Sequence, residues 1–294
     1  MKLWDRIAQH ISTQTGAPFR MQAQSDLGGG CINQACRISD GEQHYFVKTN
    51  SASRLAMFEA EYTGLNEIYA SATIRVPQPV CVGSDANTAY LVLEYLPMGG
   101  SGSSQSIERL GQNLAAMHRV TQAQYGWQRD NTIGSTAQIN DYSDDWAAFW
   151  RDKRLAFQLS LAARHGFGGR LQQQGEKLLD RLDVFFQGYQ PEASLLHGDL
   201  WSGNYGVMQS GEPVIFDPAV YYGDRETDLA MTELFGGFPI RFYDAYNNVY
   251  PLDHGYAQRK TLYNLYHILN HVNLFGSGYL GQAQTMIDSL LSET

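Results

Sequence analysis

The spacing of apolar residues changes near residue 100. Upstream of that point, alternating apolar and polar positions predict strands at residues 19–23, 34–39, 43–49, 80–83 and 89–95. Asp40-Gly41, between the second and third of these, is a strong hairpin signal. Apolar residues at steps of three and four predict helices at residues 2–15 and 54–70. The first hundred residues thus predict an antiparallel sheet with one inserted helix.

Helical spacing dominates after residue 106. Residues 97–106 are rich in Pro, Met, Gly and Ser, which is typical of a hinge or linker. Helices are predicted at residues 107–117, 142–165 and 170–187, and again from about residue 225. Short apolar runs flank polar loops at residues 194–196, 205–208 and 213–216. We therefore expect an α+β fold with two lobes, one of residues 1–97 and one of residues 98–294.

Composition narrows the possible partners and the compartment. The net charge is -9, from 21 basic and 30 acidic residues among 294, which disfavours binding to nucleic acid or to anionic membranes. The three cysteines show no CxxC spacing, and an odd number cannot all pair within the chain. The N-terminal residues are charged where a signal peptide would be apolar, and no apolar run approaches the roughly 20 residues needed to span a bilayer. We expect a cytoplasmic protein.

The strongest chemical signal is the polar loop of residues 197–204, HGDLWSGN, between two short apolar runs. Asp199 and Asn204 can converge on one point if the loop is tight. Phosphoryl transfer needs such a pair, because a carboxylate orients the attacking hydroxyl and accepts its proton while an amide oxygen holds a metal ion. The alternative interpretation is an ordinary polar turn with a buried histidine.

A second carboxylate follows one hairpin later. The apolar pair Ile215-Phe216 runs into Asp217, which places a carboxylate at the end of a buried strand. Magnesium prefers hard oxygen ligands of this kind, so Asp217 can complete a magnesium site. The alternative is that Asp217 only caps a turn.

A glycine run, Gly28-Gly29-Gly30, lies between two predicted strands. Glycines let backbone N–H groups approach phosphates closely, although a flexible hairpin tip is the simpler interpretation.

Lys48 ends the next strand within an apolar stretch. A lysine there is costly unless it is paired, and the helix at residues 54–70 offers Glu61 or, as the second choice, Glu59. The alternative is an exposed lysine beside an unrelated surface glutamate.

The strand that enters the linker is a further candidate. The backbone groups at the end of residues 90–97 have no obvious sheet partner and could hydrogen-bond the edge of an adenine ring. The alternative is an ordinary core strand. Together, the glycine loop, strand lysine, helix glutamate, hinge, catalytic aspartate, metal-binding asparagine and metal-binding aspartate occur in the order expected for a kinase.

Several segments resemble the fructosamine kinase family, which is similar to the aminoglycoside and choline phosphotransferases. They are GGGCINQACRI, FVKTN, MFEAEYTGL, LLHGDLWSGNYGV and IFDPAVYYGDRETDLAMTELFGGF. Residues 125–146, with Asn131, Gln138 and Asn140, also resemble the family. The resemblance implies a two-lobed, protein-kinase-like fold and ATP-dependent phosphorylation of ketoamines, ribulosamines or fructosamines, on the 3-hydroxyl. The acceptor would be a small ketoamine or a glycated protein amine, and the reaction would reverse glycation.

The same resemblance implies roles for individual residues. Glu61 would pair with Lys48, which would hold the ATP phosphates near Gly28, Gly29 and Gly30. Asp199 would be the base, and Trp201 would stack on the sugar, with core packing as its alternative. Asn204 and Asp217 would bind Mg²⁺, and the backbone at Glu94 and Leu96 would meet adenine.

Two further ionisable residues lie in the GDRETDLAM segment and in the loop of residues 197–204. We interpret Asp228 and His197 as residues that brace the catalytic loop.

Cys31, in the nucleotide loop, could be redox-sensitive and link two chains through a disulfide, so the protein is expected to be a monomer or such a dimer.

Departures from the protein kinases point to a small-molecule kinase. Gly198 replaces the arginine of HRD, and Asp217-Pro218-Ala219 replaces DFG. Two other functions remain open, a kinase for an aminoglycoside or choline-like acceptor and a pseudokinase that binds ATP without transfer.

Overall fold

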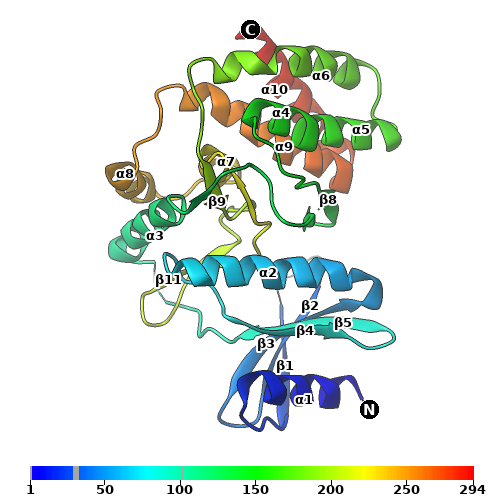
Figure 1. The fold of residues 1–294 in the computed structure, drawn as a ribbon, viewed down its shortest axis with the longest axis vertical. Helices are drawn as coiled ribbons and strands as arrows, with labels where there is room; N and C mark the ends of the chain where they lie inside the picture. The colour runs from blue at the N-terminus through cyan, green and yellow to red at the C-terminus, as the bar shows by residue number, and fades with distance from the viewer. Residues whose placement is uncertain (1, 29–32, 101) are drawn as a thin grey trace. The chain divides into compact units, whose positions relative to one another are not determined.

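The computed structural model describes residues 2–28, 33–100 and 102–294, which form two compact units (Figure 1). Unit 1 consists of Met1–Ser106 and Tyr205–Pro218, and unit 2 of Ile107–Asn204 and Ala219–Thr294. Unit 1 is built around an antiparallel sheet, whereas unit 2 is mainly helical. The predicted α+β fold class is therefore confirmed.

The sheet of unit 1 has five strands in the order β1-β2-β3-β5-β4, all antiparallel to their neighbours. Their bounds are β1 (Ala23–Leu27), β2 (Gln34–Ser39), β3 (His44–Ser51), β4 (Pro79–Ser84) and β5 (Thr88–Glu94). Four of the predicted strands are confirmed. The strand predicted at residues 19–23 is wrong, because Phe19 packs in the core beside α1 and pairing begins only at Ala23.

Two helices pack on opposite faces of this sheet (Figure 1). On one face, α1 (Leu3–Thr15) buries Ile7 and Ile11 against the sheet residues Val47 and Val92. On the other, α2 (Leu55–Ser71) packs against β4 and β5. Both predicted helices are confirmed. The position of α2 matters for the site because it carries a glutamate toward β3.

A short hairpin from far along the chain completes unit 1. It consists of β10 (Tyr205–Val207) and β11 (Pro213–Ile215). Arg75 forms a bridge to Val214, and Met98 forms a bridge to Met208. The hairpin thereby places the residues just after β11 in the same unit as β3 and α2.

Unit 2 contains a small sheet in the order β12-β9-β6, the hairpin β7-β8 and the remaining helices. Its strands are β6 (Thr121–Gln122), β7 (Asn131–Ile133), β8 (Thr136–Gln138), β9 (Ala193–Leu196) and β12 (Tyr221–Gly223). Its helices are α3 (Ser104–Met117, which begins in unit 1), α4 (Trp146–Phe149), α5 (Phe157–Arg164), α6 (Arg170–Arg181), α7 (Glu226–Leu234), α8 (Ile240–Val249), α9 (Tyr256–Phe275) and α10 (Leu280–Ser292).

The helix predicted at residues 142–165 starts later than expected. The Asp145 carboxylate accepts a hydrogen bond of 2.7 Å from the Ala148 N–H and so caps the helix before Trp146. The chain then passes through a π-helical segment, Trp150–Ala156, before α5. Such segments are rare and often lie near functional sites. Here the segment brings the buried Arg154 into the interior of unit 2.

The interior of unit 2 includes polar side chains. Helix α9 buries asparagine and histidine side chains along with its apolar ones. Burial lowers the pKa of His267 to about 3, which keeps its imidazole neutral.

Among the described residues, no helix combines the length and the apolar character that a membrane span requires.

Glu226 gives unit 2 a predicted dependence of stability on pH. Its fully buried carboxylate contacts Arg259 at 2.7 Å, and burial raises the pKa of Glu226 from 4.5 to about 7 although Arg259 opposes the shift. The folded protein therefore binds this proton more tightly than the unfolded chain. We expect the free energy of unfolding to fall as the pH rises from about 4.5 to about 7. Urea unfolding across that range measures it.

Glu226→Gln supplies the control, because the variant keeps the shape of the side chain and removes its titration. Its free energy of unfolding is expected to depend less steeply on pH than that of the unmodified protein. Equal slopes for the two proteins would show that Glu226 does not carry the effect.

Candidate active site

Three charged groups of unit 1 meet at Lys48, within β3. The Lys48 ammonium lies 2.6 Å from Oε1 of Glu61 on α2 and 2.6 Å from Oδ1 of Asp217 after β11. Lys48 is only 6% exposed. Burial opposes its charge, but the two carboxylates outweigh burial and hold the pKa of Lys48 above its ordinary value. Lys48 therefore stays charged, and the structure pairs it with Glu61.

Glu61 depends on that pairing. Its carboxylate is almost fully buried, and burial raises the pKa of Glu61, while the Lys48 ammonium works in the opposite direction. A buried carboxylate without a cationic partner would take up a proton. Each member of the ion pair therefore depends on the other, and the pair fixes the position of the Lys48 ammonium.

Asp217 has a strained backbone and an accessible side chain. Its φ is +58°, in the left-handed region that few residues other than glycine adopt. Such strain tends to be kept at functional sites. The side chain is 48% exposed although one oxygen contacts Lys48, so the carboxylate can also present an oxygen to a ligand. A hard, half-exposed oxygen of this kind fits the ligand preference of Mg²⁺.

The glycine run lies only partly within the described residues. Gly28 follows β1 and is exposed, and a Cβ added to it would meet no atom within 4 Å. Gly29, Gly30 and Cys31 lie outside the described residues. Phosphate binding by this loop and the redox role of Cys31 stay predictions.

The end of β5 differs from the prediction at Glu94. The Glu94 N–H donates a 2.8 Å hydrogen bond to the carbonyl of Gln78, and Glu94 pairs with Tyr45 of β3. The expectation that this strand end has no sheet partner is therefore wrong at Glu94. The cause is a long-range pairing with Gln78 that no local pattern reveals. Leu96 follows the strand with its side chain buried, and its contact with adenine stays a prediction.

In unit 2, one buried carboxylate braces the start of the loop of residues 197–204, the predicted catalytic loop. Oδ2 of Asp228 accepts a 2.7 Å hydrogen bond from the His197 N–H, and Oδ1 accepts a 2.8 Å bond from the Gly198 N–H. Burial acts against its charge, but the hydrogen bond and electrostatic interaction with His118, the interaction with His197 and the hydrogen bond from the Gly198 N–H keep the pKa of Asp228 below its ordinary value. The interpretation of Asp228 as a brace is confirmed.

His118 supports the same carboxylate and was missed from the sequence. Its Nε2 lies 3.1 Å from Oδ2 of Asp228, and its Nδ1 lies 2.8 Å from the hydroxyl of Tyr246. His118 follows α3 and is fully buried. No spacing signal could have found it, because 110 residues separate it from Asp228.

Asn204 folds back onto Asp199 within the loop. Its Nδ2 donates to the Asp199 carbonyl at 2.8 Å and lies 3.3 Å from Oδ2 of the Asp199 carboxylate. The amide nitrogen is thereby used inside the loop, which directs the amide oxygen the other way. An oxygen so oriented suits Mg²⁺. Asn204 belongs to unit 2 and Asp217 to unit 1.

Gly198 explains one departure from the protein kinases. Its φ is +80°, and a Cβ at this position would lie 2.1 Å from the carbonyl oxygen of Ala219. An arginine here would therefore be excluded by both backbone strain and contact. The loop instead relies on a close backbone approach between Gly198 and Ala219.

Trp201 is an exposed aromatic surface two residues after Asp199. Its side chain is 39% exposed, so the alternative of core packing is not favoured. The indole lies against Gly203, where an added Cβ would come within 2.3 Å of the ring. Glycine at 203 therefore lets the ring lie flat along the loop.

Gly203→Ala is expected to displace the Trp201 ring. If Trp201 stacks on the acceptor, as the family resemblance implies, KM for the acceptor is expected to rise about fivefold, the equivalent of roughly 1 kcal/mol of stacking energy, while KM for ATP stays unchanged. Steady-state kinetics with each substrate varied in turn measure both values. Gly281→Ala is the matched control, because a Cβ at this position of α10 meets no atom within 4 Å. An acceptor KM that is equal in both variants would contradict the prediction.

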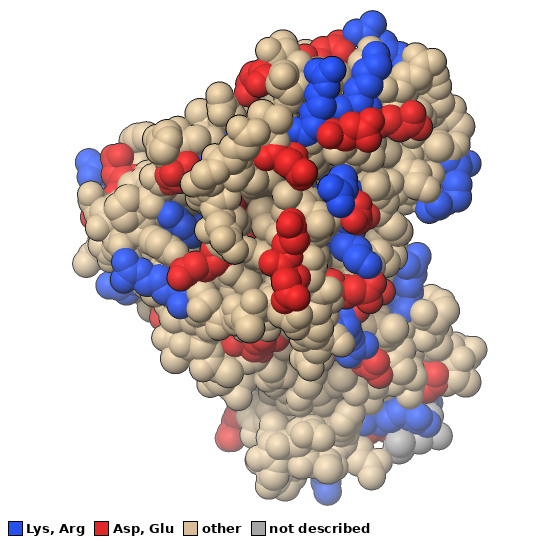
Figure 2. Space-filling model, turned by 45° about the horizontal axis from the view of Figure 1, so that its top comes forward, with Lys and Arg blue, Asp and Glu red and all other residues tan. Residues whose placement is uncertain are grey.

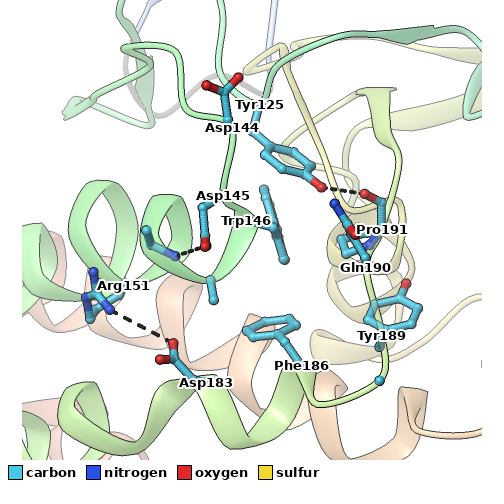
Figure 3. Close-up of a pocket in the computed structure, with 13 residues that line it drawn as sticks. Tyr125, Asp144, Asp145, Trp146, Arg151, Asp183, Phe186, Tyr189, Gln190 and Pro191 are labelled. Atoms are coloured by element: carbon cyan, nitrogen blue, oxygen red, sulfur yellow. Dashed lines mark hydrogen bonds and ion pairs between the residues drawn. The ribbon is translucent and has the colours of Figure 1, made fainter.

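Unit 2 also contains an open cavity of about 690 Å³ (Figure 3). It lies at the N-terminal end of β9, whereas the catalytic loop follows the C-terminal end of that strand. Its carboxylates already have protein partners, since Asp145 caps α4, Asp144 accepts from Gln124 and Asp183 faces Arg151. None of the predicted site residues lines it, and we assign it no part in the chemistry.

Comparison with known sequences gives a match along almost the whole chain. The sequence profile of the fructosamine kinase family matches residues 3–293. A probable ketoamine kinase of Synechocystis sp. is 53% identical over 98% of this chain and 97% of its own length. A chloroplastic protein-ribulosamine 3-kinase of Arabidopsis thaliana is 43% identical over 98% of this chain and 88% of its own length.

Solved structures give the same result for the fold. A protein of Haemophilus somnus, provisionally named fructosamine-3-kinase, superposes with a TM-score of 0.90 at 31% identity, over 98% of this chain and 97% of its own. The aminoglycoside phosphotransferase APH(4)-Ia, crystallised with AMP-PNP and hygromycin B, gives 0.64 at 16% identity over 97% of each chain. The second likeness concerns the fold alone. The predicted two-lobed, protein-kinase-like fold is confirmed.

Proposed function

Since this chain belongs to the fructosamine kinase family and is therefore an ATP-dependent phosphotransferase, we propose that its acceptor is the 3-hydroxyl of a ketoamine. The acceptor is a ribulosamine or fructosamine, either free or formed on a protein amine. The observation that carries this proposal is the full-length similarity to proteins named ketoamine kinase and ribulosamine 3-kinase. Phosphorylation of a protein-bound ketoamine makes the adduct unstable, so the activity reverses glycation.

Asp199 acts as the general base in this proposal. Its carboxylate takes the proton of the acceptor hydroxyl as the hydroxyl oxygen bonds to the γ-phosphorus of ATP. The bond between that phosphorus and the β,γ-bridging oxygen breaks, and ADP leaves with the electron pair. The brace from Asp228 supports this role, because two fixed backbone N–H groups immediately precede the base.

Lys48 and Asp217 act on the nucleotide. The ammonium of Lys48, held by Glu61, is a fixed positive charge for the ATP phosphates. Asp217 and Asn204 are the proposed Mg²⁺ ligands, on the grounds of oxygen chemistry and their places in the family motif. When bound, the ion neutralises phosphate charge.

Trp201 supplies a stacking surface for the sugar of the acceptor. An exposed indole beside the base can pack against the apolar face of a sugar without a change in charge. Figure 2 shows acidic and basic side chains intermingled on one face of the molecule, and the described residues in that view form no continuous basic stripe.

An acceptor screen with γ-labelled ATP tests the proposal. Ribulose-lysine, erythrulose-lysine and fructose-lysine are compared with an aminoglycoside and with choline, at equal concentrations. Transfer of label to one or more ketoamines in excess of the other acceptors is the expected result. Label on the aminoglycoside or choline only would indicate a different small-molecule kinase, and ATP binding without transfer to any acceptor would indicate a pseudokinase.

A further inference from the structure

The hairpin β7-β8 and the residues after it contain a cluster of buried amides with no role in the chemistry described above. Asn131, Gln138 and Asn140 are all buried, and Gln138 is only 1% exposed. Buried amides are costly unless their donors and acceptors are satisfied. The hydrogen-bond partners of these amides therefore indicate the role of the cluster.

Arg154 fixes the orientation of the first amides. An arginine can only donate, and its Nη2 lies 2.8 Å from the side-chain oxygen of Asn140. The Asn140 amide nitrogen then donates to Oδ1 of Asn131 at 3.0 Å. This leaves the Asn131 nitrogen to donate, and it does so to the carbonyl of Val220 at 2.7 Å. These hydrogen bonds all run in one direction, from the buried Arg154 guanidinium to the Val220 carbonyl.

Gln138 adds a second set of hydrogen bonds to this network, and its amide also donates toward the backbone. Its Nε2 donates to Oδ1 of Asn131 at 2.9 Å and to the carbonyl of Ala219 at 3.0 Å. Its Oε1 accepts a 2.8 Å hydrogen bond from the hydroxyl of Tyr266 on α9. Both polar ends of the Gln138 side chain are therefore occupied, and the amide cannot turn over without losing contacts.

Ala219 connects Gln138 to the catalytic loop. The Ala219 N–H donates to the carbonyl of His197 at 2.8 Å. Its carbonyl oxygen, which receives the bond from Gln138, packs directly against the α-carbon of Gly198. The next residue after Gly198 is the base, Asp199. The contact from Gln138 thus lies immediately behind the backbone from which the base projects.

We propose that Gln138 is a positioning residue for phosphoryl transfer, because it holds the Ala219 carbonyl against Gly198 and so sets the position of Asp199. This inference rests on the proposed function for its kinetic consequence and on the described contacts of unit 2 for its geometry. Asp228 accepts hydrogen bonds from N–H groups of the loop, and Gln138 holds the segment just before β12, against which the loop packs. The two supports therefore act on different backbone groups of the loop.

Gln138→Met tests the role because methionine matches the length of the side chain and has no N–H donor. The variant leaves the Ala219 carbonyl without its partner, so the carbonyl and Gly198 can shift. A displacement of about 1 Å at a catalytic group can lower turnover by about 100-fold. We expect kcat to fall by about 10- to 100-fold, with KM for ATP changed by less than about threefold, because the proposed phosphate-binding Lys48 and its partners Glu61 and Asp217 belong to unit 1.

Asn270→Leu is the matched control. Asn270 is a buried amide that donates to the carbonyl of Ile133, at the far end of the same hairpin, and accepts from Gln158. It has no described contact with Ala219. Both variants are expected to lower the melting temperature, but only Gln138→Met lowers kcat. Equal losses of kcat in the two variants, or an unchanged kcat in Gln138→Met, would overturn the proposal. If Gln138→Met fails to fold, Tyr266→Phe removes only the hydroxyl that orients Gln138, and a loss of kcat is again required.

A second readout needs no acceptor and separates this inference from the proposed function. The chain has five tryptophans, and Trp201 lies two residues after the base. In protein labelled with 5-fluorotryptophan, the Trp201 resonance is assigned through Trp201→Phe. We expect Gln138→Met to shift this resonance and Asn270→Leu to leave it in place. A Trp201 resonance that is unmoved in Gln138→Met contradicts the inference even where no ketoamine is turned over, whereas a shifted resonance with an inactive unmodified protein contradicts the proposed function only.

Discussion

Asp199→Asn is expected to lower kcat by on the order of 10²- to 10⁴-fold, the range that a general base contributes. The substituted side chain has nearly the same shape, so the contacts from Asn204 and the brace from Asp228 are retained. The groups proposed to act on the nucleotide, Lys48 and Asp217, lie in unit 1 and are untouched by this change, so KM for ATP is expected to change by less than about threefold. Steady-state kinetics at saturating ketoamine, with ADP release coupled to NADH oxidation, measure both quantities.

Asp288→Asn is the control for this experiment. Asp288 lies on α10 with an exposed side chain that pairs with Arg170, so its charge is lost without an effect on the loop. Turnover of this variant is expected to equal that of the unmodified protein. If Asp199→Asn kept more than about a tenth of the normal kcat, another group would have to be the base.

Lys48→Met is expected to damage both stability and nucleotide use. The change removes the cation between Glu61 and Asp217 and leaves the buried Glu61 carboxylate without its partner. Breaking one side of a buried ion pair costs about 3–5 kcal/mol of unfolding free energy. Loss of the fixed charge that is proposed to hold the phosphates is expected to lower kcat/KM for ATP by at least about 100-fold. Urea unfolding and initial rates measure the two effects.

The double variant Lys48→Met/Glu61→Gln separates these effects. A neutral amide in place of the Glu61 carboxylate removes the unpaired buried charge, so most of the lost unfolding free energy is expected to return. Activity is not expected to return, because the phosphates still lack their cation. Recovery of activity in the double variant would show that Lys48 serves the fold and not the nucleotide.

The parts of the fold that depend on neighbours in sequence could be predicted. Strands β2 and β3 were predicted because alternation and the Asp40-Gly41 turn are local signals. The pairing of Lys48 with α2 was predicted for a related reason, since a lysine in an apolar strand requires an acidic partner on a packed element. The loop at residues 197–204 was recognisable because its chemistry lies within eight consecutive residues.

The remainder depends on contacts between distant parts of the chain. The pairing of Glu94 with Gln78, the support of Asp228 by His118 and the contact of Gln138 with Ala219 join residues 16, 110 and 81 positions apart. A buried amide or histidine has no characteristic spacing, and its partner is fixed only when the elements have packed. Phe19 was mistaken for a strand residue because burial beneath a helix produces the same alternation as pairing in a sheet.

Nuclear magnetic resonance of the product tests the central claim most directly. The protein is incubated with ATP, Mg²⁺ and ribulose-lysine, and the product is analysed by ¹H–³¹P correlation. The account predicts a new phosphate monoester whose phosphorus couples to the proton on C3 of the sugar, together with one ADP for each ester formed. Consumption of ATP without such an ester, or a phosphate on another hydroxyl, would contradict it.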